Sequence, residues 1–136
     1  MKILVLCGRD ESSNAVINEI RKSDDSITVI MEDPVSRKTL LKRRIKKLGI
    51  KTVLGQLIFM LVVPKLLRLK SKQRVNEIIN EYKLNFSDDY KKELEFHQVP
   101  SINDGVVIDI INKANPDLII VNGTRIISKK ILDCVT

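Results

Sequence analysis

The sequence contains few of the residues that build metal centres and disulfide frameworks. Among its 136 residues are one histidine, two cysteines and no tryptophan. A single histidine without a cysteine cluster argues against a zinc site. Cys7 and Cys134 are too few for a disulfide framework, so we expect two reduced thiols in a cytoplasmic protein. No metal ligand is predicted.

Glycine is scarce where a dinucleotide-binding loop would need it. The chain has five glycines, and Gly8 directly follows the first apolar segment. In a G-x-G-x-x-G fingerprint the second glycine would stand at Asp10, and Asn14 lies near the third position. The sequence therefore does not predict a site for NAD.

Acidic residues are absent from one long stretch of an otherwise acidic chain. Thirteen of the 24 Lys and Arg residues lie between Pro34 and Asn76, where there is no Asp or Glu, and the other 11 stand against 17 acidic residues. This composition indicates an acidic domain with one basic segment rather than a uniformly basic nucleic-acid binder. The stretch contains one aromatic residue, Phe59, which argues against stacking on single-stranded nucleic acid.

The basic segment, residues 34–84, is expected to be an inserted helical hairpin that is apolar as well as charged. Helices are predicted over residues 36–47 and 73–82, the second with three residues directed inward: Val75, Ile78 and Ile79. The window from Ile50 to Leu69 is strongly apolar but is interrupted by polar residues and a proline: Lys51, Gln56, Pro64, Lys65 and Arg68. These interruptions argue against a transmembrane span.

Four interpretations of the basic segment stay open. It is a solvated hairpin that covers the sheet, an interfacial helix on an anionic membrane through residues 35–75, a docking surface for a partner protein, or a surface that steers a nucleotide-sugar or tRNA. The second interpretation would place a cytoplasmic protein at the periphery of a membrane.

Four strand-like segments alternate with helical ones in the rest of the chain. Strands are expected over residues 2–7, 27–31, 94–99 and 118–121. Helices are expected over residues 15–23 and 105–113, and residues 85–92 are expected to be a polar turn. In the second of these helices four residues should be buried: Val106, Val107, Ile110 and Ile111. The pattern predicts an α/β fold with a Rossmann-like parallel sheet in the order 3-2-1-4.

The last strand, Leu118–Val121, has four consecutive apolar residues and reads as buried on both faces. In the expected order its far side would be unpaired, and an unpaired apolar strand is an aggregation hazard. We therefore expect further strands from a missing carboxyl-terminal part of the fold, or from an oligomeric partner. Residues 1–136 would then form an incomplete amino-terminal domain.

Two loops carry a resemblance to a known family. The first contains Gly8, Ser12, Ser13 and Asn14, and the second contains Asn122, Gly123, Thr124, Arg125, Ile126 and Ile127. They resemble the substrate-binding and folate-lining loops of the formyltransferase fold shared by glycinamide ribonucleotide formyltransferase, methionyl-tRNA formyltransferase and the sugar N-formyltransferases. The resemblance covers most of the chain outside residues 34–92.

The resemblance implies 10-formyltetrahydrofolate as the cofactor and a small-molecule amine or nucleotide-sugar as the substrate. Ile126 and Ile127 would form apolar walls for the pteridine, and backbone groups beside Ile127 would hydrogen-bond it. Asn122 would hold the loop shape through side-chain to backbone bonds. The alternative for Arg125 and the two isoleucines is a loop that packs on the core.

The first loop also has two interpretations. Ser12, Ser13 and Asn14 are residue types that cap helices, so they can be a cap alone. If they bind substrate instead, the helix N-terminus would receive an anionic group. Asp10 and Glu11 depart from the family pattern and would repel a phosphate, so a sugar or another less charged group is an equal candidate.

Catalysis in the family requires an Asn-x-His pair and an Asp, which stabilise the oxyanion and manage the proton. This sequence stops before those positions, so no catalytic residue is assigned and the chain alone is expected to be inactive. His97 is read as a half-exposed strand residue. The alternative function is a non-catalytic α/β module that docks on a membrane or a partner through its basic segment.

Overall fold

The strand β1 (Lys2–Gly8) lies at the centre of the sheet between two parallel neighbours. The computed structural model describes residues 1–23 and 25–134. β1 pairs with β2 (Ser26–Glu32) and with β4 (Leu118–Asn122), and β3 (Glu95–Val99) pairs with the far side of β2. The order β3-β2-β1-β4, with all neighbours parallel, confirms the predicted α/β fold and strand order.

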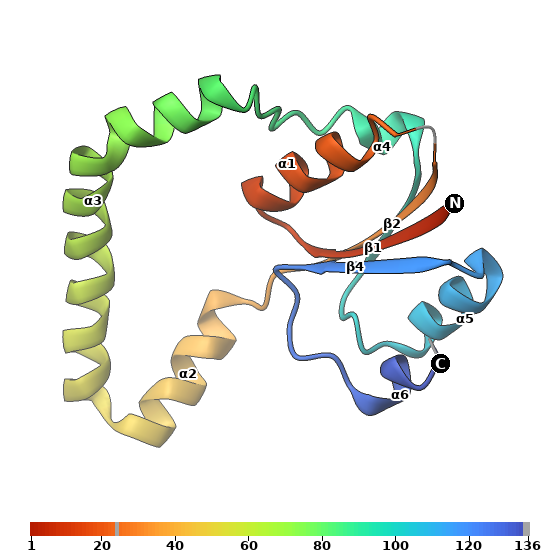
Figure 1. Ribbon diagram of the computed structural model, residues 1–136. Coiled ribbons are helices and arrows are strands. Elements are labelled where there is room, and N and C mark those ends of the chain that lie inside the picture. Colours follow the sequence, from red (N-terminus) through yellow and green to blue (C-terminus); the bar gives the residue numbers. More distant parts are fainter. Residues whose placement is uncertain (24, 135–136) are drawn as a thin grey trace. The chain divides into compact units, whose positions relative to one another are not determined.

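Helices cover both faces of this sheet (Figure 1). On one face lie α1 (Glu11–Ile20) and the short α4 (Tyr90–Glu93). On the other lie α5 (Gly105–Ala114) and α6 (Lys129–Leu132). This is the layered arrangement that alternating strands and helices are expected to form.

Each face of the sheet has its own hydrophobic core. Val5 and Cys7 of β1 pack with Ile17 of α1, whereas Leu4 and Leu6 pack on the side of α5 and α6. Successive strand residues point to opposite faces, so a strand buried on both sides must be apolar throughout. This explains the unbroken apolar run of β1.

β4 is more exposed than expected for a strand buried on both faces. Leu118 and Val121 are 43% and 50% exposed, while Ile119 and Ile120 between them are half-buried. Each face of β4 therefore has one half-buried and one exposed side chain. The expectation was wrong because, among the described strands, only β1 lies beside β4 at this edge of the sheet.

The segment 85–92 is not simply a polar turn, because it contains α4. Tyr90 is wholly buried there, and its hydroxyl donates a hydrogen bond to the Asn14 side-chain oxygen at 2.8 Å. Burial raises the pKa of Tyr90 to about 12. Tyr90 stands between the charged residues Asp89 and Lys91, so the sequence pattern missed this core position.

The same segment is fastened to α1 by two asparagines. Asn18 donates hydrogen bonds to the carbonyls of Asn85 at 2.8 Å and Ser87 at 2.9 Å. Asn14 donates to the carbonyl of Phe86 at 3.1 Å. The chain that leads into α4 is therefore held along the surface of α1 before β3 begins.

In α5 the expected apolar stripe is present but narrower. Val107 and Ile111 are buried and Ile110 is half-buried, whereas Val106 is 55% exposed. Residues 107 and 111 are one helical turn apart and share a face, while 106 lies about 100° away from 107. The predicted burial of Val106 was therefore wrong.

The chain divides into two compact units. The sheet unit consists of Met1–Pro34 and Leu84–Thr136, and the helical unit is Val35–Lys83. The helical unit contains α2 (Arg37–Leu48) and α3 (Ile50–Glu81), which are separated at Gly49. Gly49 has a φ of +79°, a conformation that glycine adopts easily.

α3 is one continuous helix where a separate helix over residues 73–82 was expected. Pro64 lies inside it without ending it, and the ribbon of α3 bends along its length (Figure 1). Proline removes one backbone hydrogen bond and commonly bends a helix. Val75 and Ile78 are exposed rather than inward, because α3 is about 48 Å long and α2 only about 18 Å, so α2 covers only part of it.

The two cysteines should differ sharply in reactivity. Cys7 is wholly buried, and burial together with the nearby Asp10 carboxylate raises its pKa to about 12. Cys134 is half-buried near the end of α6. We predict that a thiol reagent such as 5,5′-dithiobis(2-nitrobenzoate) at pH 8 modifies Cys134 alone in the folded chain. The variant Cys134→Ser should react only in denaturing urea, and Cys7→Ser should keep the fast reaction; rapid modification of folded Cys134→Ser would contradict the burial of Cys7.

Candidate functional site

The loops that follow β1 and β4 meet at one edge of the sheet. The two strands run parallel with Cys7 opposite Asn122, so both end at the same edge. A Cβ atom added to Gly8 would lie 2.2 Å from the carbonyl oxygen of Gly123. The backbones therefore approach so closely that only glycine fits at position 8. The site is built where parallel α/β sheets commonly hold ligands.

Gly123 is required for two reasons. Its φ is +67°, and a Cβ atom there would lie 2.7 Å from a carboxylate oxygen of Asp10. A left-handed backbone conformation strains other residues, and the short contact adds a clash. Gly123 thus constrains the direction in which the loop leaves β4.

Asn122 connects the two loops through its side chain. Its amide nitrogen donates hydrogen bonds to the hydroxyls of Ser13 at 3.0 Å and Ser12 at 3.2 Å. The expected side-chain to backbone bonds within the loop are replaced by side-chain bonds between loops. Five of the residues predicted from the sequence are brought together in this way: Gly8, Ser12, Ser13, Asn122 and Gly123.

The N-terminus of α1 is capped by Asp10, not by the three residues expected to do so. One carboxylate oxygen of Asp10 accepts hydrogen bonds from the Ser13 backbone N–H and the Ser12 hydroxyl, both at 2.8 Å. Burial opposes its ionisation, but the bonds from Ser13 and Ser12 outweigh that effect and the pKa of Asp10 lies below its usual value. A negative charge thus already occupies the helix N-terminus, which is otherwise an anion site.

Asn14, the last predicted residue of the first loop, is directed elsewhere. Its side chain binds the Phe86 carbonyl and the Tyr90 hydroxyl. It therefore supports the packing of α4 and is not part of the site.

Buried Glu32, at the end of β2, fixes the second loop from beneath. It is 3% exposed, and its carboxylate accepts hydrogen bonds from the backbone N–H of Ile102 at 2.8 Å and of Arg125 at 3.0 Å. The Arg125 side chain forms an ion pair with the same carboxylate at 3.3 Å. A buried carboxylate is tolerated because charge and hydrogen bonds compensate its lost hydration.

Arg125 ties the loop to the ends of two other strands. Its terminal nitrogen donates to the carbonyls of Asp33 at 2.8 Å and Pro100 at 3.2 Å. These residues directly follow β2 and β3. The guanidinium group therefore acts on the shape of the loop.

Asn103 holds the other end of the loop. Its side-chain nitrogen donates to the Ile126 carbonyl at 3.0 Å, and its oxygen accepts from the Ser128 N–H at 2.7 Å. The backbone groups on either side of Ile127 that were expected to meet a ligand are thus used within the chain. Ser128 directly precedes α6, but its hydroxyl makes no capping bond.

The remaining loop residues differ in exposure. Ile126 is 93% exposed, whereas Ile127 is half-buried and packs against the core beneath α5 and α6. The Thr124 hydroxyl donates to the carbonyl of Arg125. Ile126 is therefore the residue of this loop that offers an apolar surface to a ligand.

Sequence reasoning missed Glu32 and Asn103, although each carried a signal. Glu32 is a carboxylate at the end of an apolar strand, and Asn103 lies in a short polar loop before a helix.

Within residues 1–23 and 25–134 no group of three or more His, Cys, Asp or Glu residues is arranged to hold a metal ion. His97 lies on β3, two strands away from β1, beside Glu95 at 3.2 Å.

Comparisons of the chain with protein-family models, curated proteins and solved structures find no match. The resemblance of the two loops to the formyltransferases therefore rests on their residues alone.

The close approach at Gly8 gives a stability prediction. Gly8→Ala should lower the free energy of unfolding by about 1–3 kcal/mol, because the added methyl group overlaps the Gly123 carbonyl. Gly105→Ala is the matched control, since a Cβ atom there meets nothing within 4 Å. Urea denaturation followed by circular dichroism measures both variants. Equal stability of Gly8→Ala and wild type would show that the two loops do not touch.

A second prediction concerns the carboxylate beneath the loop. Glu32→Gln should lower the free energy of unfolding by about 1–3 kcal/mol. The neutral amide has one accepting oxygen instead of two, so it cannot bind both backbone N–H groups and also compensate the charge of Arg125. Glu19→Gln removes a surface ion pair to Lys22 and should cost under about 1 kcal/mol. Hydrogen exchange at the Arg125 amide should accelerate in Glu32→Gln but not in Glu19→Gln. Unchanged exchange in both variants would contradict the role of Glu32.

Proposed function

We propose that the chain is the amino-terminal part of a formyltransferase that moves a formyl group from 10-formyltetrahydrofolate to a primary amine. The observation that supports this most directly is the meeting of two loops that each resemble the family. Asn122 of the second loop binds Ser12 and Ser13 of the first, at the carboxyl ends of β1 and β4. A folate and an amine bound to the two loops would lie next to each other, as a transfer reaction requires.

The second loop has the properties expected of a wall for a flat ring. Ile126 presents a nearly fully exposed side chain, and covering it with a pteridine would remove apolar surface from water. Glu32, Arg125 and Asn103 hold the loop in one shape before any ligand arrives. A preformed loop loses little conformational entropy on binding. In this proposal Ile127 supports the wall from the core.

The first loop favours an amine without a phosphate at this position. Asp10 places a carboxylate on the N-terminus of α1, and Glu11 follows it. A phosphate would be repelled there, whereas a sugar hydroxyl or an amine can donate a hydrogen bond to a carboxylate. This supports a small or sugar-linked amine as the acceptor.

Chemistry needs groups that this sequence does not contain. The attack of the amine nitrogen on the formyl carbon produces an oxyanion and releases a proton, which the family meets with an Asn-x-His pair and an Asp. His97 is preceded by Glu95 and Phe96, so no such pair is formed with the one histidine of the chain. We therefore assign binding to these residues and no catalytic step.

The alternative function, a module that docks through its basic segment, is favoured by a separate observation. Most of the apolar side chains of α3 are exposed. Because α3 belongs to the helical unit and the two loops to the sheet unit, the two functions concern different parts of the chain.

Binding of a stable folate tests the proposal on the chain as it exists. Calorimetry with 5-formyltetrahydrofolate should detect weak binding, and Ile126→Asp should weaken it at least about tenfold, or about 1.4 kcal/mol. Leu132→Asp is the matched control, since Leu132 is an exposed apolar residue of α6. No binding at millimolar folate, or equal affinity of Ile126→Asp and wild type, would refute the folate site. The reading frame beyond Thr136 gives an independent check, because the proposal requires a strand with Asn-x-His there.

A further inference from the structure

The helical unit exposes an apolar segment that it cannot cover by itself. We define this segment as residues 52–64 of α3, which contain no charged residue. The six consecutive residues from Leu57 to Val62 are 38% to 63% exposed, and Val53 is the one buried residue among those whose burial is described in Val35–Lys83. A contiguous exposed apolar surface on a protein marks a binding site or an aggregation hazard.

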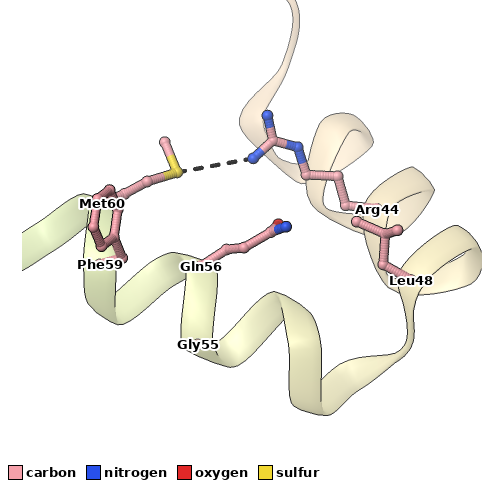
Figure 2. A pocket seen from close by; sticks show the side chains of 6 residues that line it. All are labelled: Arg44, Leu48, Gly55, Gln56, Phe59 and Met60. Atoms are coloured by element: carbon pink, nitrogen blue, oxygen red, sulfur yellow. Dashed lines mark hydrogen bonds between the residues drawn. The ribbon is translucent and has the colours of Figure 1, made fainter.

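α2 covers little of this surface. Between α2 and α3 lies an open groove of about 480 Å³, bordered by Leu40, Leu57, Leu61 and neighbouring residues. In the adjoining groove Arg44 of α2 reaches toward the Met60 sulfur at 3.8 Å, and Gln56 points toward α2 (Figure 2). This contact between Arg44 and Met60 is long and polar. It does not cover the exposed apolar side chains of α3.

Cations surround the apolar segment on both sides. α2 carries seven Lys and Arg residues, and Lys51 precedes the segment directly. Five more cations follow it in α3: Lys65, Arg68, Lys70, Lys72 and Arg74. No acidic residue lies between Pro34 and Asn76, so this charge is not neutralised within the stretch. An apolar helix bordered by Lys and Arg is complementary to an anionic lipid surface.

The sheet excludes the simplest membrane arrangement, a single span. α3 is long and apolar enough to cross a membrane by length and composition. However, β1 and β2 precede the helical unit and β3 and β4 follow it, and all four strands pair in one sheet. Both ends of the helical unit must therefore lie on the same side of a membrane. α2 cannot provide a return span, because its 12 residues are too short and too charged.

The length of the uncharged segment also argues against a transmembrane span. Its 13 residues span about 20 Å as a helix, whereas the hydrocarbon core of a bilayer is about 30 Å thick. A helix of this length with cations at both ends fits the boundary between the headgroups and acyl chains of one leaflet.

We propose that the apolar segment of α3 lies in one leaflet of an anionic bilayer, with the flanking cations among the lipid headgroups. The sheet unit stays in water, on the side of the membrane where both ends of the helical unit lie. This association concerns the helical unit alone and does not depend on folate binding.

Co-sedimentation of the whole chain with lipid vesicles tests whether an anionic bilayer covers the apolar segment. The chain should pellet with vesicles of phosphatidylcholine and phosphatidylglycerol, much less with phosphatidylcholine alone, and less at high salt, which screens the cations. Equal binding to neutral and anionic vesicles, or none to either, would overturn the proposal. A stable dimer in sedimentation velocity together with no vesicle binding would show that a second copy covers the segment instead.

Matched variants separate the apolar and electrostatic contributions. Ile58→Gln with Phe59→Gln should reduce binding at least about tenfold, since two exposed apolar side chains are lost. The control Val106→Gln, an exposed apolar residue of the sheet unit, should bind like wild type. Circular dichroism should show unchanged helix content in both proteins. Equal loss in variant and control would overturn the assignment to α3.

The charge is tested in the same way. Lys46→Gln with Lys47→Gln should weaken binding to anionic vesicles about tenfold or more, because each cation near an anionic surface contributes favourably. Lys92→Gln with Lys130→Gln removes the same charge from the sheet unit and should change binding little. Identical losses in the two double variants would refute the role of the basic segment.

The depth of the helix distinguishes one leaflet from a span. Because the sequence has no tryptophan, Phe59→Trp introduces a single emission reporter. The tryptophan emission should shift to the blue on binding anionic vesicles. Lipids whose acyl chains are brominated near the headgroup should quench it most. Strongest quenching by bromines at the bilayer centre, or no shift at all, would overturn the proposed position.

Discussion

The pairing of β1 with β2 on one side and β4 on the other is the constraint from which the rest of the structure follows. Because β1 and β4 are parallel neighbours, the loops after them must emerge at the same edge and within hydrogen-bonding distance. Because β2 and β3 are also parallel neighbours, the inserted chain leaves β2 at its carboxyl end and returns to β3 at its amino end. One set of backbone hydrogen bonds thus determines which loops form the candidate site and between which two points the inserted chain runs.

Within that constraint, polar side chains beneath the loops decide their shape. Glu32 gathers two backbone N–H groups and the guanidinium of Arg125, and Asn103 joins the Ile126 carbonyl to the Ser128 N–H. These bonds leave the backbone few alternatives, while Ile126 projects into solvent. The loop is held by hydrogen bonds where it is attached, and it presents an apolar side chain where it is open.

Much of the fold could be predicted because it depends on local patterns. Apolar runs identified β1, β2 and β4, and the alternation of apolar and polar residues identified β3. The alternation of these strands with helices gave the parallel order. The failures lie where tertiary context decides: Tyr90 is a core residue in a polar segment, Leu118 is exposed by its edge position, and Asp10 takes the cap from Ser12 and Ser13. Pro64 did not end α3, since a helix can continue past a proline with a bend. In the site, the resemblance of the second loop pointed to Asn122 and Arg125, but it did not reveal Glu32, whose partners are about 70 and 90 residues away.

The attachment of residues 85–87 to α1 has a mechanical consequence. Asn14 and Asn18 bind three successive carbonyls just where the chain re-enters the sheet unit. A pull on the carboxyl end of the helical unit would therefore have to break these bonds before it reached the edge strand β3.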